Sequence, residues 1–213
     1  MKTHPVLRPR TAARERRRAD ALRAVAGAAG VTAAAALASP SGVSLLEREV
    51  FEAINSAPAA VDAPLWVVTQ TGSFAAVFVT AGLALVARRS RLAMALAAGG
   101  TATWLLAKVV KEVVDRGRPA TLLHDVAIHG APATGLGFPS GHAAVAACLM
   151  TVADPYLSRP ARVVGWTVVV VVAFARVVVG AHLPLDAVGG LLLGWTMGSL
   201  TNLTFGVPRP AGS

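Results

Sequence analysis

The sequence predicts an all-α integral membrane protein: a bundle of six transmembrane helices with a short amphipathic helix on its outer surface. Of its 213 residues, 54% are hydrophobic and 15% are charged, whereas soluble domains carry about 25% charged residues. The apolar residues are gathered into long runs instead of short amphipathic periods. Lys and Arg recur in the gaps between these runs, which is typical of multi-pass membrane proteins.

Six apolar runs are predicted membrane spans, because a hydrocarbon core of ~30 Å requires roughly 20 apolar residues in a helix. The runs cover residues 21–39, 65–87, 92–110, 142–157, 163–181 and 186–205. The first is alanine-rich and is therefore a weak candidate for a membrane span. Pro155 kinks or ends the fourth. Together they predict one domain over 21–206, with a basic tail at 1–20 and a short C-terminal tail at 207–213.

The basic residues predict how the spans are oriented. The formal net charge of +9 first suggests a nucleic-acid partner. However, Lys and Arg are concentrated in the N-terminal tail and in the gaps 88–91 and 158–162. The positive-inside rule assigns these segments and both termini to the cytoplasm, and 40–63, 111–141 and 182–186 to the outer face. We therefore expect a protein of the plasma (inner) membrane with membrane lipids, and no nucleic acid, as partners. The basic tail could also rest on anionic lipid.

The outer segment 40–63 contains apolar residues at helical spacing. Leu45, Leu46, Val50, Phe51 and Ile54 share one side, and charged residues occupy the other. This spacing predicts a short amphipathic helix on the outer membrane surface. A plain connecting loop is the alternative interpretation.

Three cations lie where the positive-inside rule expects few. The stretch KVVKEVVDRGRP contains Lys111, Arg116 and Arg118, at the outer end of the third span. Any one of them could be an anchor whose charged end reaches the membrane surface. Three together are suited to binding a multiply charged anion, of which a lipid phosphate is the obvious example.

A second outer stretch, GLGFPSGHAAVAA, begins the fourth span. Ser140 is a favoured N-cap residue, and Gly141 lets another group approach the backbone closely. A helix start presents free N–H groups and a partial positive charge, which suit an oxyanion. His142 stands at this helix start. The alternative is an interfacial histidine without a function.

The third stretch, ARVVVGAHLPLD, joins the fifth and sixth spans. Arg176 lies inside the fifth span near its outer end, where a charged group usually serves a function. Pro184 disfavours a continuous helix from His182 to Asp186, so these two residues are expected to flank a turn. A carboxylate near an imidazole can hold Nδ1–H and leave Nε2 nucleophilic.

The predicted orientation brings all three stretches to one face of the membrane. They supply cations for spread-out negative charge, one histidine to attack and one to protonate a leaving oxygen, which suits phosphoryl transfer. No metal-ligand spacing of His, Cys or carboxylates is evident, and the single cysteine, Cys148, can form no disulfide within the chain. No metal or other cofactor is therefore expected.

These residues resemble the type 2 phosphatidic acid phosphatase superfamily, which consists of membrane lipid phosphatases. Its signatures K-x6-R-P, P-S-G-H and S-R-x5-H-x3-D are matched by Lys111 to Pro119, Pro139 to His142, and Arg176 to Asp186. Ala175 stands where the family usually has serine. The resemblance covers roughly residues 45–205 and leaves the basic tail outside.

The resemblance implies a role for each motif residue. His182 would be the nucleophile that forms a phosphohistidine, oriented by Asp186, and His142 would be the general acid. The phosphate would be held by Lys111, Arg118, Arg176, Ser140 and the amide of Gly141. Members of this type need no metal. Arg116 is outside the motif and is interpreted as a secondary electrostatic contributor or a surface residue.

The function that the sequence predicts is hydrolysis of a lipid phosphate or pyrophosphate at the outer leaflet. The expected substrate is a polyprenyl pyrophosphate, followed by phosphatidic acid or phosphatidylglycerol phosphate. A lipid phosphotransferase would use the same residues, and a small anion transporter is the alternative from another class. The loop 119–138 should influence lipid specificity. Its His124 and His129 could line the mouth of the site, and ordinary loop histidines are the favoured interpretation. The sequence does not indicate an oligomeric state.

Overall fold

The computed structural model describes residues 14–38 and 42–208. The expected basic tail therefore lies largely outside the described residues, as do Ser39 and Arg209. The chain forms helices α1 (Arg18–Leu37), α2 (Leu45–Asn55), α3 (Asp62–Thr69), α4 (Phe74–Val86), α5 (Ser90–Val114), α6 (Pro119–Leu122), α7 (Gly141–Ala153), α8 (Arg159–Val178) and α9 (Pro184–Phe205). Two short strands, β1 (Arg14–Glu15) and β2 (Val207–Pro208), pair antiparallel.

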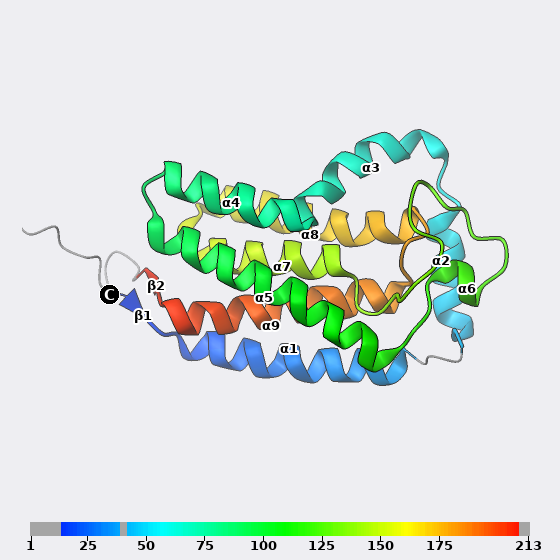
Figure 1. Cartoon of the computed structure of the whole chain (residues 1–213), viewed down its shortest axis with the longest axis horizontal. Coiled ribbons are helices and arrows are strands. Elements are labelled where there is room, and N and C mark those ends of the chain that lie inside the picture. The colour runs from blue at the N-terminus through cyan, green and yellow to red at the C-terminus, as the bar shows by residue number, and fades with distance from the viewer. Residues whose placement is uncertain (1–13, 39–41, 209–213) are drawn as a thin grey trace, which may run out of the picture.

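The long helices form a bundle whose two ends differ in structure (Figure 1). Helices α1, α4, α5, α7, α8 and α9 run along the length of the bundle, whereas α2 and α6 lie across one end together with the loop that follows α6. The paired strands lie at the opposite end, so α1 begins and α9 finishes there. The core of the bundle is α7, which is buried at every position from Ala143 to Val152.

The expected all-α architecture is confirmed, but the number of membrane spans is only partly matched. Among the described residues, α1, α5 and α8 are long and apolar enough to cross a membrane, and a bent pair, Ala63–Gly72 with Phe74–Val86, makes a fourth. The predicted fourth span, 142–157, is a 13-residue helix of about 20 Å. The predicted sixth span is the 22-residue α9, whose apolar run is interrupted by glycines and polar residues.

The predicted second span, 65–87, is not one continuous helix. It bends by 66° between α3 and α4, where a short 3-10 turn, Gln70–Gly72, separates them. Ser73 begins α4 by accepting a hydrogen bond from the Ala76 N–H through its side chain, at 3.3 Å. At the bend, Gly72 packs against the backbone carbonyl of His142, a position that leaves no room for a side chain.

Glycines let α9 pack closely against α7. Gly190, Gly194 and Gly198 recur every four residues, so they lie on one face of the helix. A Cβ at Gly190 or Gly194 would collide with the carbonyl oxygens of Ser140 or Ala144. This close approach joins the starts of the two helices, where the Ser140 N–H donates to the Asp186 carbonyl at 2.8 Å.

Gly194→Ala is expected to destabilise the protein by about 1–3 kcal/mol, because the added Cβ would overlap backbone atoms of α7 that cannot move aside easily. Gly82→Ala is the matched control, since a Cβ at Gly82 in α4 meets nothing within 4 Å and alanine favours a helix. The measurement is the apparent Tm of each variant in detergent. Equal Tm values for the two variants would contradict the close α7–α9 packing.

Candidate active site

The three polar stretches meet at a cavity of about 580 Å³. Six of the eight site residues expected from the sequence line it: Lys111, Arg118, Gly141, His142, Arg176 and His182. Ser140 and Asp186 are fully buried and lie outside the cavity lining. The structure thus brings together residues that are up to 75 positions apart in the sequence, from α5 to α9.

His182 lies in the turn between α8 and α9. Its backbone N–H donates to the carbonyl of Arg176 at 3.1 Å. Gly180 makes the turn possible, because its φ of +70° is a conformation that side-chain-bearing residues rarely adopt. The imidazole is only 3% exposed. Burial, followed by the charges of Lys111 and Arg176, lowers the pKa of His182 well below its ordinary value. The ring is therefore neutral at neutral pH, the form in which a ring nitrogen is nucleophilic.

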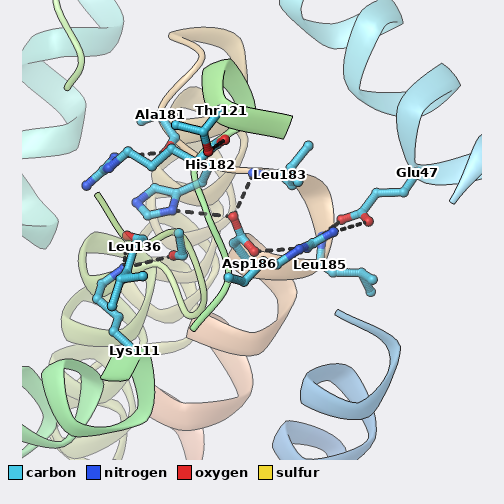
Figure 2. Close-up of polar contacts among 12 residues, drawn as sticks. Glu47, Lys111, Thr121, Leu136, Ala181, His182, Leu183, Leu185 and Asp186 are labelled. Carbon is cyan, nitrogen blue, oxygen red and sulfur yellow. Dashed lines mark hydrogen bonds and ion pairs between the residues drawn. The ribbon is translucent and has the colours of Figure 1, made fainter. Parts of the chain in front are cut away.

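Asp186 is the carboxylate nearest to His182 (Figure 2). Its Oδ2 atom lies 3.7 Å from Nδ1 of His182, which is longer than a hydrogen bond. The same oxygen accepts a hydrogen bond from the Leu183 N–H at 2.9 Å. Catalytic hydrogen bonds are often long in ligand-free structures and shorten when substrate binds. The two residues thus lie side by side, as the predicted pair requires, but Nδ1 of His182 and Oδ2 of Asp186 are not hydrogen-bonded.

The cations around the cavity are tied to the backbone in different ways. Lys111 donates to the carbonyls of Leu136 and Gly137, at 2.9 and 2.8 Å, and holds the loop that leads into α7 (Figure 2). Arg118 donates to the Ala181 carbonyl at 2.9 Å. The Nε atoms of Arg118 and Arg176 are buried and have no hydrogen-bond partner within the described residues. Unused donors on these two arginines, with the charge of Lys111 beside the same cavity, suit a phosphate group.

The start of α7 presents polar groups to the same region. Ser140 occupies the N-cap position, as expected from the sequence, but its side chain makes no capping hydrogen bond. Its hydroxyl is instead buried without a partner in the part of the chain that the structure describes. A Cβ at Gly141 would meet nothing within 4 Å, so the backbone there faces open space. The first N–H groups of α7 are consequently available to an oxyanion.

The structure shows where four further residues lie whose contribution the sequence left open. Arg116 is not a surface residue, because its side chain is fully buried and contacts Asp186 at 3.0 Å. His129 lines the cavity, whereas His124 is exposed and lies outside the lining. Ala175 is fully buried and does not line the cavity, so the missing hydroxyl removes no group from the cavity wall.

Helix α2 supplies two residues that the sequence analysis did not assign to the site. Glu47 contacts Arg116. The Asn55 amide donates to the carbonyls of Ala127 and Val178 at 2.8 Å each, and so joins the loop 123–140 to the end of α8. Glu47 and Asn55 lie two helical turns apart with Phe51 between them, and all three are buried. The sequence signal that could have revealed these contacts is the four-residue spacing of Glu47, Phe51 and Asn55. This spacing places two polar residues on the same helix face as an aromatic one.

Within residues 14–38 and 42–208, no group of three or more His, Cys, Asp or Glu side chains is arranged to hold a metal ion. A family model described as the PAP2 superfamily matches residues 89–208, which is more than half of the chain. The chain belongs to the PAP2 superfamily. The match includes all eight expected site residues of this PAP2 chain and begins just after α4.

One curated relative is phosphatidylglycerophosphatase B of Bacillus subtilis (strain 168). It is 34% identical over 102 residues, and the alignment covers 42% of this PAP2 chain and 46% of the relative. The comparison thus spans about half the length of the relative.

Two solved structures show that the fold is shared. LpxE of Aquifex aeolicus has a TM-score of 0.69 at 24% identity, with 74% of this PAP2 chain and 95% of LpxE covered. The first transmembrane PAP2-type phosphatidylglycerolphosphate phosphatase from Bacillus subtilis has a TM-score of 0.69 at 22% identity, with 84% and 94% covered.

Proposed function

We propose that this PAP2 chain is a membrane lipid phosphatase that hydrolyses a terminal phosphate through a phosphohistidine at His182. The observation that carries the proposal is the convergence of two histidines and three cations at one cavity beside the start of α7. A neutral buried histidine provides a nucleophile, and the surrounding cations can stabilise the charge of a transferring phosphoryl group.

The proposed topology has six membrane crossings, with both termini in the cytoplasm and the cavity on the outer side. The pairing of β1 with β2 supports it, because α1 begins and α9 finishes at the same end of the bundle. Arg88, Arg89 and Arg91 line a second cavity together with Pro208, and so belong to that end. The catalytic cavity is near α2, at the other end. Helix α2 would lie on the outer membrane surface, with Leu45 and Leu46 exposed to lipid. The domain is proposed to extend over 21–206.

In the first step, Nε2 of His182 attacks phosphorus while the bond from phosphorus to the leaving oxygen breaks. His142, in its imidazolium form, donates a proton to that oxygen, which leaves as the lipid alcohol or lipid phosphate. Asp186 stabilises the positive charge that the imidazole acquires. The groups proposed to bind the phosphate oxygens are Lys111, Arg118, Arg176, Ser140 and the Gly141 amide. Unpartnered polar atoms on Arg118, Arg176 and Ser140 support this proposal.

In the second step, a water molecule attacks the phosphohistidine. His142, now deprotonated, accepts a proton from that water, the N–P bond breaks, and inorganic phosphate is released. His182 is thereby restored to its neutral form. Because the charge on phosphate is met by Lys111, Arg118 and Arg176, neither step requires a metal ion.

The substrate proposed is a lipid phosphate monoester or pyrophosphate. The curated relative gives weight to phosphatidylglycerol phosphate, and phosphatidic acid and polyprenyl pyrophosphate share the chemistry that the cavity recognises. A lipid phosphotransferase remains the second candidate, because an alcohol can replace water in the second step. An anion transporter would use the same cations without the histidines.

Purified protein in detergent is expected to release inorganic phosphate from at least one of these lipids without an added acceptor, and to retain this activity in EDTA. The assay compares phosphatidylglycerol phosphate, phosphatidic acid and polyprenyl pyrophosphate, each with and without EDTA. Loss of phosphate release in EDTA, with recovery on adding a metal, would contradict the mechanism. Transfer that requires an added alcohol would identify a phosphotransferase, and phosphate flux into liposomes without hydrolysis would identify a transporter.

A further inference from the structure

Arg116 occupies a position unlike those of the other cations near the site. Lys111 and Arg118 line the cavity, but Arg116 does not. It follows the end of α5, where Asp115 has a φ of +51° and turns the chain away from the helix. Its side chain is 0% exposed. It therefore cannot contact a phosphate in the cavity without a rearrangement of the buried groups around it.

The guanidinium group of Arg116 is held between two carboxylates. It donates to Glu47 through both terminal nitrogens, from Nη1 to Oε1 at 3.1 Å and from Nη2 to Oε2 at 2.6 Å. Nη1 also donates to Oδ1 of Asp186 at 3.0 Å. Glu47 and Asp186 are buried as well. Burial alone would lower the pKa of Arg116, but the hydrogen bond and charge of Glu47 and the charge of Asp186 outweigh it and raise this pKa. The group is a permanent cation.

These contacts determine how Asp186 faces His182. Figure 2 shows Asp186 between His182 and Glu47. One carboxylate oxygen, Oδ1, is bound by Arg116, while Oδ2 accepts from the Leu183 N–H and points toward Nδ1 of His182. Rotation of the carboxylate would break the hydrogen bonds on both sides. The Arg116 cation also favours the ionised form of Asp186 in a buried place where a lone carboxylate would tend to be neutral.

Glu47 extends this arrangement to α2. Its Oε1 accepts a second hydrogen bond from the Leu185 N–H at 3.0 Å. Its own N–H donates to the Ser44 side chain at the start of α2, at 3.2 Å. A glutamate at this position commonly folds back onto the first N–H groups of its own helix, whereas this side chain reaches Arg116 and the start of α9. Helix α2 thus contacts the start of α9, directly after the turn that carries His182, through the bond between Glu47 and Leu185.

Building on the proposed function, we propose that Arg116 and Glu47 are positioning residues that act on catalysis through Asp186. They fix the carboxylate so that Oδ2 can accept the hydrogen bond from Nδ1 of His182 and Nε2 faces phosphorus. Neither residue touches the substrate. Their loss should therefore lower kcat and leave KM nearly unchanged.

The test compares Arg116→Lys and Glu47→Gln with Glu52→Gln, a control on the exposed face of α2. Each substitution is made in the wild type and in an Asp186→Asn background, and kcat and KM are measured for the best lipid of the panel. In the wild-type background, Arg116→Lys and Glu47→Gln should lower kcat about 10- to 100-fold, with KM within about twofold and the control unchanged. In the Asp186→Asn background the same substitutions should change kcat by less than about threefold, because the group that they position is gone.

Several outcomes would overturn this inference. An equal fractional loss of kcat in both backgrounds would mean that Arg116 and Glu47 only support the fold. A raised KM with unchanged kcat would mean that they contact the substrate. Full activity of both variants would contradict the inference and leave the proposed function intact, whereas a wild type that hydrolyses no lipid phosphate would refute the proposed function itself. Glu47→Gln keeps the shape of the side chain, so it carries the test if Arg116→Lys does not fold.

Discussion

His182→Asn is expected to lower phosphate release by about 10,000-fold or more, because the substitution removes the atom that forms the bond to phosphorus. Losses of this size are typical when the nucleophile of a two-step hydrolase is removed. The loss should be equally severe for every substrate, whatever its leaving group, since the bond between Nε2 and phosphorus forms in the first step for all of them. The measurement is inorganic phosphate released per enzyme under single-turnover and steady-state conditions.

His124→Asn is the matched control for this substitution. His124 is exposed and does not line the cavity, so its replacement should leave both kcat and KM unchanged. The apparent Tm of each variant in detergent separates loss of chemistry from loss of fold. A folded His182→Asn variant with more than about a tenth of wild-type activity would refute the assignment of His182.

His142→Asn is expected to produce a loss that depends on the leaving group. A general acid contributes about 100- to 10,000-fold when the departing oxygen needs a proton. The alcohol of a lipid phosphate monoester is a poor leaving group and needs this proton. With p-nitrophenyl phosphate, whose phenolate leaves without protonation, the first step should be nearly as fast as in the wild type. The measurement is the rate of the first turnover for both substrates.

The comparison of the two histidine variants distinguishes their roles. His182→Asn should be inactive on both substrates, and His142→Asn should be impaired chiefly on the lipid. Equal losses on both substrates for His142→Asn would show that it does not act as the acid for the leaving group. The opposite result, a leaving-group dependence at His182, would show that the two roles are exchanged.

The sequence predicted which residues meet at the cavity, because these residues belong to short motifs whose spacing is visible in the sequence. The distribution of Lys and Arg alone predicted that Lys111, His142 and His182 lie on the same face of the membrane. The structure places these three residues around one cavity. The signals were strong because charged groups are rare inside membrane spans and few cations are expected on the outer side. The roles of these residues are still predictions, which the experiments above address.

The features that the sequence did not reveal depend on long-range packing. Glu47 and Arg116 are 69 positions apart, and each alone resembles an ordinary surface charge. Only the folded chain brings both beside Asp186. The bend at Gly72 depends on the carbonyl of His142 in another helix.

The stereochemical course at phosphorus tests the central claim most directly. The substrate is a lipid phosphorothioate labelled so that phosphorus is chiral, and it is hydrolysed in water that carries a third oxygen isotope. Transfer to His182 and then to water comprises two in-line displacements, so the account predicts net retention of configuration in the released thiophosphate. Net inversion would mean that water attacks phosphorus directly, and it would contradict the phosphohistidine intermediate.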